Sequence, residues 1–472
     1  YCIFRYEKYL TIFSVDIEND NYNKILMYKK KLLSVYLNEF NYEYLLRGAK
    51  KFRCQNIISI LKRKKYLTKT NDKTQNKNLD PWVQNVSINV GIESKYHKIY
   101  NLGEDIFLKQ DQIWDVLANK NKKVLIWGPM NAKFRENKNL KLFFPDPWNS
   151  NQQTKPKKLE YLTLLPNYYA RNYLKPKTAK LIKYSFLFFL GLLFNGYAFK
   201  LVKYLPILIK VFLLRGFNNY LLFLLLDLIS VIGVKSETKK FNPDFSLIFL
   251  NSIAHFQHNH WNEQNEQKIF FQFVDIIFLE LLSLEKYYSS KLIFNGFSQK
   301  RISDRYILRP QNPKKFLHDI GLTFSKLNQN MTNGGLIFFK NKQKKNENLN
   351  ILRKVKLGKN FLFETHSINN KTIFYRVQLI SSSPIKYISS NNLDKFLSYD
   401  KKKINKIKAK KYINLNVNDL FNFKFIKSTG VHVASGVILL NNTNIKKKYL
   451  NKNQIFNNNI FKIIQDYFNE KL

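Results

Sequence analysis

The chain is poor in the residues that build disulfide frameworks and zinc fingers. Its 472 residues include only two cysteines, Cys2 and Cys54, which form no CxxC pair. Neither a disulfide-stapled fold nor a cysteine-ligated zinc site is therefore indicated, and a reducing compartment is expected. Glycine and proline are also few, at 15 and 12 residues, and the sequence has no internal repeat of useful period.

Acidic residues are scarce as well. There are 33 Asp and Glu against 79 Lys and Arg, a formal net charge of +46. Such a charge can indicate a nucleic-acid or anionic-membrane partner. However, the lysines accompany many Asn, Ile, Phe and Tyr residues, which share AT-rich codons, and the charge is spread along the chain. We therefore favour codon bias over a binding patch, and expect the lysine-rich tracts 342–345 and 401–411 to be solvated.

Long uncharged apolar runs are missing too. The longest, Tyr184 to Phe199, has 16 residues and contains Asn195, whereas a membrane-spanning helix needs about 20. Buried or surface-docked helices are therefore expected over 180–235, with an interfacial hairpin and snorkelling lysines as the alternative. No apolar segment with a small-residue cleavage site opens the chain, so we expect no signal peptide and slightly favour an intracellular location.

What is present is the composition of an ordinary globular protein, with 45% apolar and 24% charged residues. Short apolar runs typical of buried strands alternate with helical patterns, which predicts a mainly parallel sheet with helices on both faces. The strands are expected at Leu10–Val15, Val124–Gly128, Phe245–Leu250 and Lys291–Phe294, with further strands over 360–382. The helices are expected at 25–65, Gln112–Leu117, Ile269–Leu284 and Ile455–Leu472.

Histidines gather directly after one predicted strand. His255, His258 and His260 are three of the seven histidines and fall within six residues. Imidazole is a common metal ligand, and the carboxyl ends of strands in an open α/β sheet are where sites form. The alternative is that these side chains only bind backbone groups in a loop.

Two further candidates stand alone in the sequence. Asp16 follows the predicted strand Leu10–Val15, and His432 lies between glycines in a late segment. Each is more often a cap or turn residue than a ligand when taken singly. Taken together with the histidine segment and in this order along the chain, they favour the hypothesis that all of these residues share one metal site.

Several motifs resemble those of one protein family. They occur in the same order as in that family, and together they extend over most of the chain. They include Pro81-Trp-Val-Gln, Gln112-Ile-Trp-Asp, Met130-Asn-Ala, Phe144-Pro-Asp-Pro-Trp, Asn251-Ser-Ile-Ala-His255, Phe294-Asn-Gly, Met331-Thr-Asn-Gly and Gly430-Val-His432. Together they resemble the alkaline phosphatase-like superfamily, in its type I phosphodiesterase/nucleotide pyrophosphatase-like branch. The resemblance implies one α/β domain over 1–472, with the apolar stretch 180–235 as a helical insertion.

The resemblance also implies a metal-assisted site. In the family, two metal ions, typically zinc, clamp a phosphate, and a Thr or Ser acts as nucleophile. Carried over by position, the metal ligands are Asp16, His255 and His432, with His258 as a further candidate. Asn251, Asn295 and Asn131 are the expected substrate-binding residues.

The chain departs from the family pattern at several positions. Asn251 replaces an aspartate, Phe294-Asn295 replaces an Asp-His pair, and Leu79 and Asp80 occupy the nucleophile position without a hydroxyl. Divalent cations need negative ligands, so one metal site is expected instead of two. The nucleophile is therefore left unassigned. The nearest hydroxyl after Leu79 and Asp80 is that of Ser87, which is expected to lie inside a helix.

Three functions follow, in order of preference. The first is a divalent-metal-dependent hydrolase of phosphate or sulfate esters, with a small phosphorylated or sulfated substrate. The second is a catalytically inactive relative that serves as a binding or scaffold protein. The third is a nucleic-acid or anionic-membrane binder, which the charge alone motivates.

Overall fold

The computed structural model describes most of the chain. The described residues are 30–70, 72, 79–149, 153–172, 176–216, 219–329, 334–357, 360–378, 380–381, 413–414, 423–441 and 455–469. Asp16, its predicted strand and the Lys401–Lys411 tract therefore lie outside the described part.

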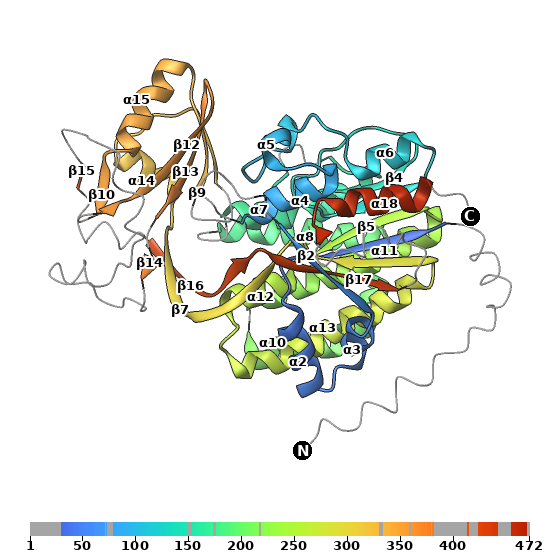
Figure 1. Cartoon of the computed structure of the whole chain (residues 1–472). Coiled ribbons are helices and arrows are strands. Elements are labelled where there is room, and N and C mark those ends of the chain that lie inside the picture. The colour runs from blue at the N-terminus through green and yellow to red at the C-terminus, as the bar shows by residue number, and fades with distance from the viewer. Residues whose placement is uncertain are drawn as a thin grey trace.

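An eight-stranded sheet forms the centre of the molecule (Figure 1), in the order β18-β2-β17-β6-β1-β5-β3-β4. The strands are β1 (Leu32–Leu37), β2 (Lys64–Lys69), β3 (Val124–Trp127), β4 (Leu140–Phe144), β5 (Phe245–Leu250), β6 (Ser290–Phe294), β17 (Ser435–Asn441) and β18 (Ile455–Phe456). The run β6-β1-β5-β3-β4 is parallel throughout. Only β17 is antiparallel, both to β6 and to β2. The predicted mainly parallel sheet is thus confirmed.

Helices cover both faces because the central strands are apolar on both sides. All six residues of β1 and of β5 are buried, which is typical of parallel strands between two helical layers. One layer contains α2 (Tyr42–Lys51), α3 (Gln55–Leu61), α11 (Asn219–Phe241), α12 (Ser252–Asn259) and α13 (Gln264–Glu285). The other contains α4 (Pro81–Val90), α6 (Ile113–Asn119) and α18 (Asn459–Asn469).

A helical segment connects β4 to β5 and includes the apolar stretch 180–235. It consists of α7 (Glu160–Asn172), α8 (Thr178–Phe194), α9 (Tyr197–Leu201), η3 (Val202–Tyr204), α10 (Leu205–Arg215) and α11. Among the described residues no single helix has the length and hydropathy to cross a membrane. One bent pair, Thr178–Phe194 with Tyr197–Val211, meets both criteria only when its members are taken together.

A smaller antiparallel sheet lies beside the central one (Figure 1), in the order β12-β13-β9-β8. Its elements are α14 (Pro313–Asp319), β8 (Lys326–Gln329), β9 (Gly334–Phe338), α15 (Lys342–Leu352), β12 (Phe363–Asn369) and β13 (Thr372–Val377). They bury a hydrophobic cluster of their own, which includes Ile337, Leu352 and Tyr375. The long strands β7 (Ser298–Pro310) and β16 (Phe423–Val433) pair with each other and lead from one sheet toward the other. The single domain over 1–472 stays a prediction.

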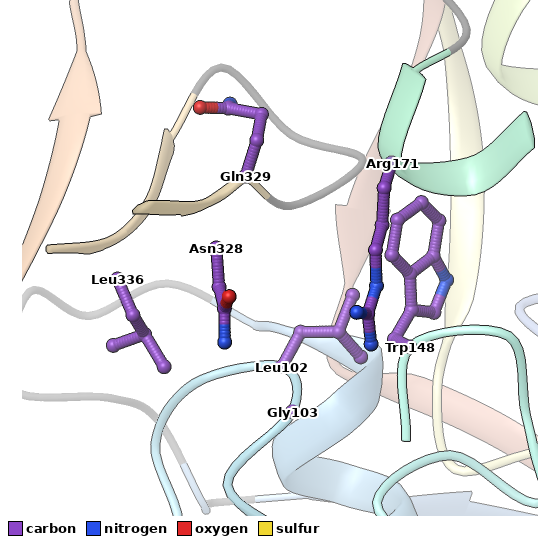
Figure 2. Close-up of a pocket in the computed structure, with 7 residues that line it drawn as sticks. All are labelled: Leu102, Gly103, Trp148, Arg171, Asn328, Gln329 and Leu336. Atoms are coloured by element: carbon purple, nitrogen blue, oxygen red, sulfur yellow. The ribbon is translucent and has the colours of Figure 1, made fainter. Parts of the chain in front are cut away.

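A small pocket opens where the two parts meet (Figure 2). Trp148 and Arg171 line it from the larger part, and Asn328 and Leu336 line it from β8 and β9. None of the candidate metal ligands belongs to its lining.

The first part of the fold differs from the sequence-based expectation. Residues 25–65 were expected to be helical, but within the described part they form β1, α2, α3 and the start of β2. The apolar run of β1 is short and carries no clear period, so it resembles a buried helix segment as closely as a strand. The expected strands at Val124–Gly128, Phe245–Leu250 and Lys291–Phe294 are present, as are the helices over 112–117 and 269–284.

Candidate metal site at the carboxyl edge of the sheet

Three neighbouring parallel strands end in polar residues at the same edge of the sheet. Asn38 and Glu39 follow β1, Asn251 follows β5, and Asn295 follows β6. Because these strands pair directly and in parallel, their carboxyl ends meet, which is where open α/β sheets hold ligands.

Glu39 is the one carboxylate among these strand-end residues. Its backbone has φ of +51°, in the left-handed region that a side chain with a Cβ rarely adopts. Its side chain is only 2% exposed. Gln299 donates to its Oε2 at 2.7 Å, and the Asn38 amide donates to its Oε1 at 3.2 Å. A strained backbone that holds a buried carboxylate in this way is a common feature of functional sites.

His258 reaches Glu39 from α12. Asp227, in α11, accepts hydrogen bonds from the backbone amides of Asn251 and Ser252 at the start of this helix. This carboxylate satisfies amides that have no partner within the helix and matches the helix dipole. His258 Nε2 then lies 2.8 Å from Glu39 Oε2.

His432 approaches from β16. The Thr429 hydroxyl donates to the carbonyl of Gln257 in α12 at 2.9 Å, which ties the strand to the helix. At Gly430 a Cβ atom would lie 2.3 Å from Gln299 Oε1 and 2.8 Å from the Gln257 carbonyl oxygen. Only glycine therefore allows β16 to come this close, and this approach brings His432 Nε2 to 2.9 Å from Glu39 Oε2.

The three side chains have the arrangement of a metal ligand set. One ligand atom from each lies within 4.8 Å of the others, and the two imidazole Nε2 atoms are 3.4 Å apart. Ligands about 2.0–2.2 Å from a tetrahedral zinc ion are separated by roughly 3.3–3.6 Å, so the cluster fits a cation after a small expansion. The imidazoles are partly open to solvent, with side chains 31% and 23% exposed for His258 and His432.

The tautomer of His432 also suits a ligand. Its Nδ1 donates to the carbonyl oxygen of Leu79. A neutral ring then presents a lone pair at Nε2, directed at the cluster. Metal-binding histidines are usually fixed in this way, by a hydrogen bond from the second ring nitrogen to a backbone carbonyl.

The charges of the cluster are strongly coupled in the absence of a cation. Burial acts to raise the pKa of Glu39, but His432 and His258 hold that pKa well below its usual range. Burial likewise disfavours the charged form of His432, yet Glu39 outweighs it and raises the pKa of this imidazole. A proton on His432 thus takes the place that a cation would fill, and the two compete.

One hydrogen bond joins Asn38 and Asn251. The Asn38 amide nitrogen donates to Asn251 Oδ1 at 2.7 Å, whereas Asn38 Oδ1 is buried without a hydrogen-bond partner among the described residues. Two amides carry no net charge, so this pair offers a second cation little attraction. The geometry therefore supports one cation.

Asn295 and Asn131, the other expected substrate-binding residues, are engaged with the backbone. Asn295 donates to the Phe40 carbonyl at 2.8 Å and accepts from the Val437 amide at 2.7 Å. Asn131 accepts from the Gly103 amide and donates to the Asn101 carbonyl. Their expected roles stay predictions.

His255, an expected ligand, lies outside the three-residue cluster. Its ring stacks on Phe223 of α11 with centroids 3.4 Å apart. Burial, with His258 nearby, lowers its pKa to about 3, so the ring is neutral. Its Nε2 is buried and has no hydrogen-bond partner among the described residues. Of the predicted ligands, the cluster thus unites His258 and His432.

A second charged pair lies beside the cluster and joins the start of α4 to the smaller sheet. Arg376 of β13 has Nη2 3.7 Å from Oδ2 of Asp80, which precedes α4. Burial raises the pKa of Asp80, with Arg376 and His432 opposing and Glu364 and Glu39 adding to the rise. The Nε of Arg376 is buried without a hydrogen-bond partner in the described part of the chain.

Ser87 is not arranged as a nucleophile. His97 Nδ1 accepts from the Ile99 amide at 3.1 Å, so the proton is on Nε2 and is donated to Ser87 Oγ at 2.9 Å. Burial lowers the pKa of His97 to about 3. Ser87 in turn contacts Asp72 and the Val83 carbonyl. His97 therefore cannot accept the Ser87 proton, and this network is structural.

Sequence reasoning missed Glu39, Asp80 as an acid, and Arg376. The signal for Glu39 was the apolar run of β1, which ends in Asn-Glu just as the run before Asp16 ends in an acid. No local pattern marks Arg376, because its approach to Asp80 depends on how the smaller sheet packs.

Comparisons with known proteins concern the fold. No family model matches the chain, and no curated protein is significantly similar in sequence. Among solved structures, phosphonoacetate hydrolase from Sinorhizobium meliloti with phosphonoformate is 9% identical, with TM-score 0.39 over 93% of this chain and 96% of that one. Murine ectonucleotide pyrophosphatase/phosphodiesterase 5 is 10% identical, with TM-score 0.40 over 93% and 95%.

A variant of TAB5 alkaline phosphatase with Mg bound is also similar, at 10% identity and TM-score 0.38 over 94% of this chain and 99% of that one. At such scores these structures contribute nothing to the assignment of the site or of the activity. The likeness to the alkaline phosphatase-like superfamily therefore stays a resemblance of the sequence motifs.

Proposed function

We propose that this chain is a hydrolase of phosphate or sulfate esters, of the phosphodiesterase/nucleotide pyrophosphatase type, that uses one divalent cation. The observation that carries the proposal is the cluster of Glu39, His258 and His432 at the carboxyl edge of the sheet. Zinc is the expected cation, because one carboxylate and two imidazoles form a ligand set typical of catalytic zinc, which leaves a position open.

Charge balance supports an anionic substrate. A divalent cation held by one carboxylate keeps a net positive charge, and the Arg376 guanidinium adds another beside it. Arginine binds phosphate and sulfate oxygens through paired hydrogen bonds. Its buried Nε, without a partner among the described residues, is a donor available for such an oxygen.

Proton transfer can be assigned to Asp80. When bound, the cation would neutralise substrate charge and activate water. Asp80 has a raised pKa and lies beside His432 and Arg376, so it can hold the proton that the leaving ester oxygen needs. Because Leu79 and Asp80 offer no hydroxyl, we propose direct displacement by water, without a covalent phospho-enzyme.

The metal test uses two substitutions at Glu39. Wild-type protein is expected to bind one zinc per chain in calorimetry and in metal analysis after gel filtration. Glu39→Gln should lower zinc affinity about 10- to 100-fold or more, since it removes the only charged ligand. Glu39→Gly should do the same while relieving the left-handed backbone, so it should remain folded.

His318→Ala is the matched control, because His318 is exposed and lies on α14, away from the cluster. It should leave zinc stoichiometry unchanged. Wild-type protein that binds no zinc, manganese or magnesium would disprove the metal site.

The activity test separates this function from that of an inactive relative. Hydrolysis of a nitrophenyl phosphodiester or sulfate ester should require the cation and fall strongly in Asp80→Asn and Arg376→Gln. The missing hydroxyl at Leu79 and the three strand-end asparagines favour a binding protein as the second candidate. Stoichiometric zinc without turnover across such esters would support that candidate, and a phosphorylated Ser or Thr would eliminate it.

A further inference from the structure

The helices between β4 and β5 expose large apolar side chains in regular rows. In α8, Ile182, Phe186 and Phe189 recur at helical spacing and are 51–65% exposed. In the following helices, exposed residues recur every three or four positions, at Phe199, Val202, Leu205, Ile209 and Leu213. Phe199 and Leu213 are 74% and 78% exposed. We call these eight residues the apolar rows.

The opposite sides of these helices are anchored to the protein. Phe188 and Leu192 of α8 are buried, and Gly191 lies against Leu162 of α7. Tyr204 is buried and donates to Glu280 of α13. The outward rows are therefore a fixed surface feature, and a soluble monomer rarely exposes so many large apolar residues without a partner.

Charge identifies the kind of partner. Between Glu160 and Asp227 the chain has no Asp or Glu but nine Lys and Arg residues. Lys180, Lys183 and Lys210 are exposed on the same helices as the apolar rows. Helices that lie in the interface of an anionic membrane typically combine large apolar residues such as Phe, Leu and Ile with lysines and contain few acids.

A second copy of the chain fits less well. A symmetric dimer through this surface would bring each set of lysines against its own copy without any acid to pair with them. The shape also suits a membrane surface. Neither Thr178–Phe194 nor Tyr197–Val211 alone is long and apolar enough to span a bilayer, and the two are bent by 92° relative to each other.

We propose that α8 to α10 dock on the surface of an anionic lipid bilayer, with the apolar rows in the acyl–headgroup boundary and the lysines at the phosphates. This inference does not depend on the proposed hydrolase activity. It assigns a binding surface to the helical segment that otherwise only covers one side of the sheet.

The experiment is cosedimentation of the full chain with vesicles of phosphatidylcholine alone or with added phosphatidylserine. Wild-type protein should partition onto the anionic vesicles, and Phe199→Asp with Leu213→Asp should lower this partition about tenfold or more. The control, Tyr96→Asp, changes a residue 61% exposed on α5 (Ser94–His97) and should have no effect.

Two further measurements separate insertion from simple charge attraction. Phe199→Trp should show a blue-shifted emission on adding anionic vesicles. Lys180→Glu, Lys183→Glu and Lys210→Glu together should abolish the preference for phosphatidylserine, whereas Lys314→Glu, Lys340→Glu and Lys342→Glu should not.

The proposal would be overturned if wild type and the Phe199/Leu213 variant bound anionic vesicles equally. It would also be overturned if the emission of Phe199→Trp did not shift when these vesicles are added. So would it be by gel filtration in which wild type is a dimer and the Phe199/Leu213 variant a monomer, because the rows would then be a contact between copies. Unchanged thermal melting of the variants confirms that lost binding is not lost folding.

Discussion

The proposal of a single cation rests partly on the neutral amide pair of Asn38 and Asn251. Replacing both by aspartate would set two carboxylates against each other beside Glu39, which costs stability without metal. We expect Asn38→Asp/Asn251→Asp to melt below wild type in chelator and to gain more than wild type from added zinc. Calorimetry should show stoichiometry rising from one toward two. If the double variant still binds one zinc per chain, the two new carboxylates do not form a second site with neighbouring groups such as the buried His255.

Gly430 sets how closely β16 approaches α12. In Gly430→Ala the new methyl would overlap the Gln299 amide and the Gln257 carbonyl, and backbone cannot move aside cheaply. We expect a loss of about 1–3 kcal/mol in unfolding free energy and weaker zinc binding, because His432 is two residues away. Gly430 is not among the left-handed glycines, so this loss is steric. Gly196→Ala is the comparison: its Cβ meets nothing within 4 Å, so any loss there comes from its left-handed backbone alone. Denaturant titration and calorimetry measure the two effects.

At the scale of elements, Glu280 joins α13 to the helical segment. Its carboxylate accepts from Lys203 and Tyr204 and, at 3.1 Å, from Lys235. Burial acts against the charge, but these partners lower the pKa of Glu280 to about 2. The group therefore binds its proton more weakly in the folded state, and its contribution is present above pH 4.5 and lost as the pH falls toward 2.

We expect Glu280→Gln to cost about 1.5–3 kcal/mol near neutral pH and to flatten the loss of stability between pH 4.5 and 2. Thermal melts across that window test this. A variant with the same acid-side slope as wild type would show that the ion pairs are too solvated to matter.

Elements with a strong local pattern could be predicted, and those defined by packing could not. β5 and the histidine segment were readable because an apolar run of strand length precedes polar residues. β1 has the same character, yet Asn38 and Glu39 were not singled out, because residues 25–65 were expected to be helical. Glu39 acts through a left-handed backbone position, which no side-chain pattern reveals. Arg376 reaches Asp80 only because a separate sheet packs there.

At the scale of the whole molecule, a cation would join three segments that are far apart in sequence. Glu39, His258 and His432 come from β1, α12 and β16, so a metal that binds only the folded state raises its stability by mass action. We expect zinc at about 100 times its dissociation constant to add about 2.7 kcal/mol. Scanning calorimetry with zinc and with chelator measures it, and Glu39→Gln should remove the difference.

The placement of β17 has a consequence for biosynthesis. Among the described strands, β2 (64–69) is linked to β6 and the rest of the parallel run through β17 (435–441), which is made some 370 residues later. His432 lies just ahead of β17. Residues 435–441 must therefore be translated before β2 can join the sheet, and the same late stretch supplies His432 to the cluster. Until then the nascent polypeptide carries an open strand edge and two of the three residues of the cluster, so we expect it to need protection from aggregation during that time.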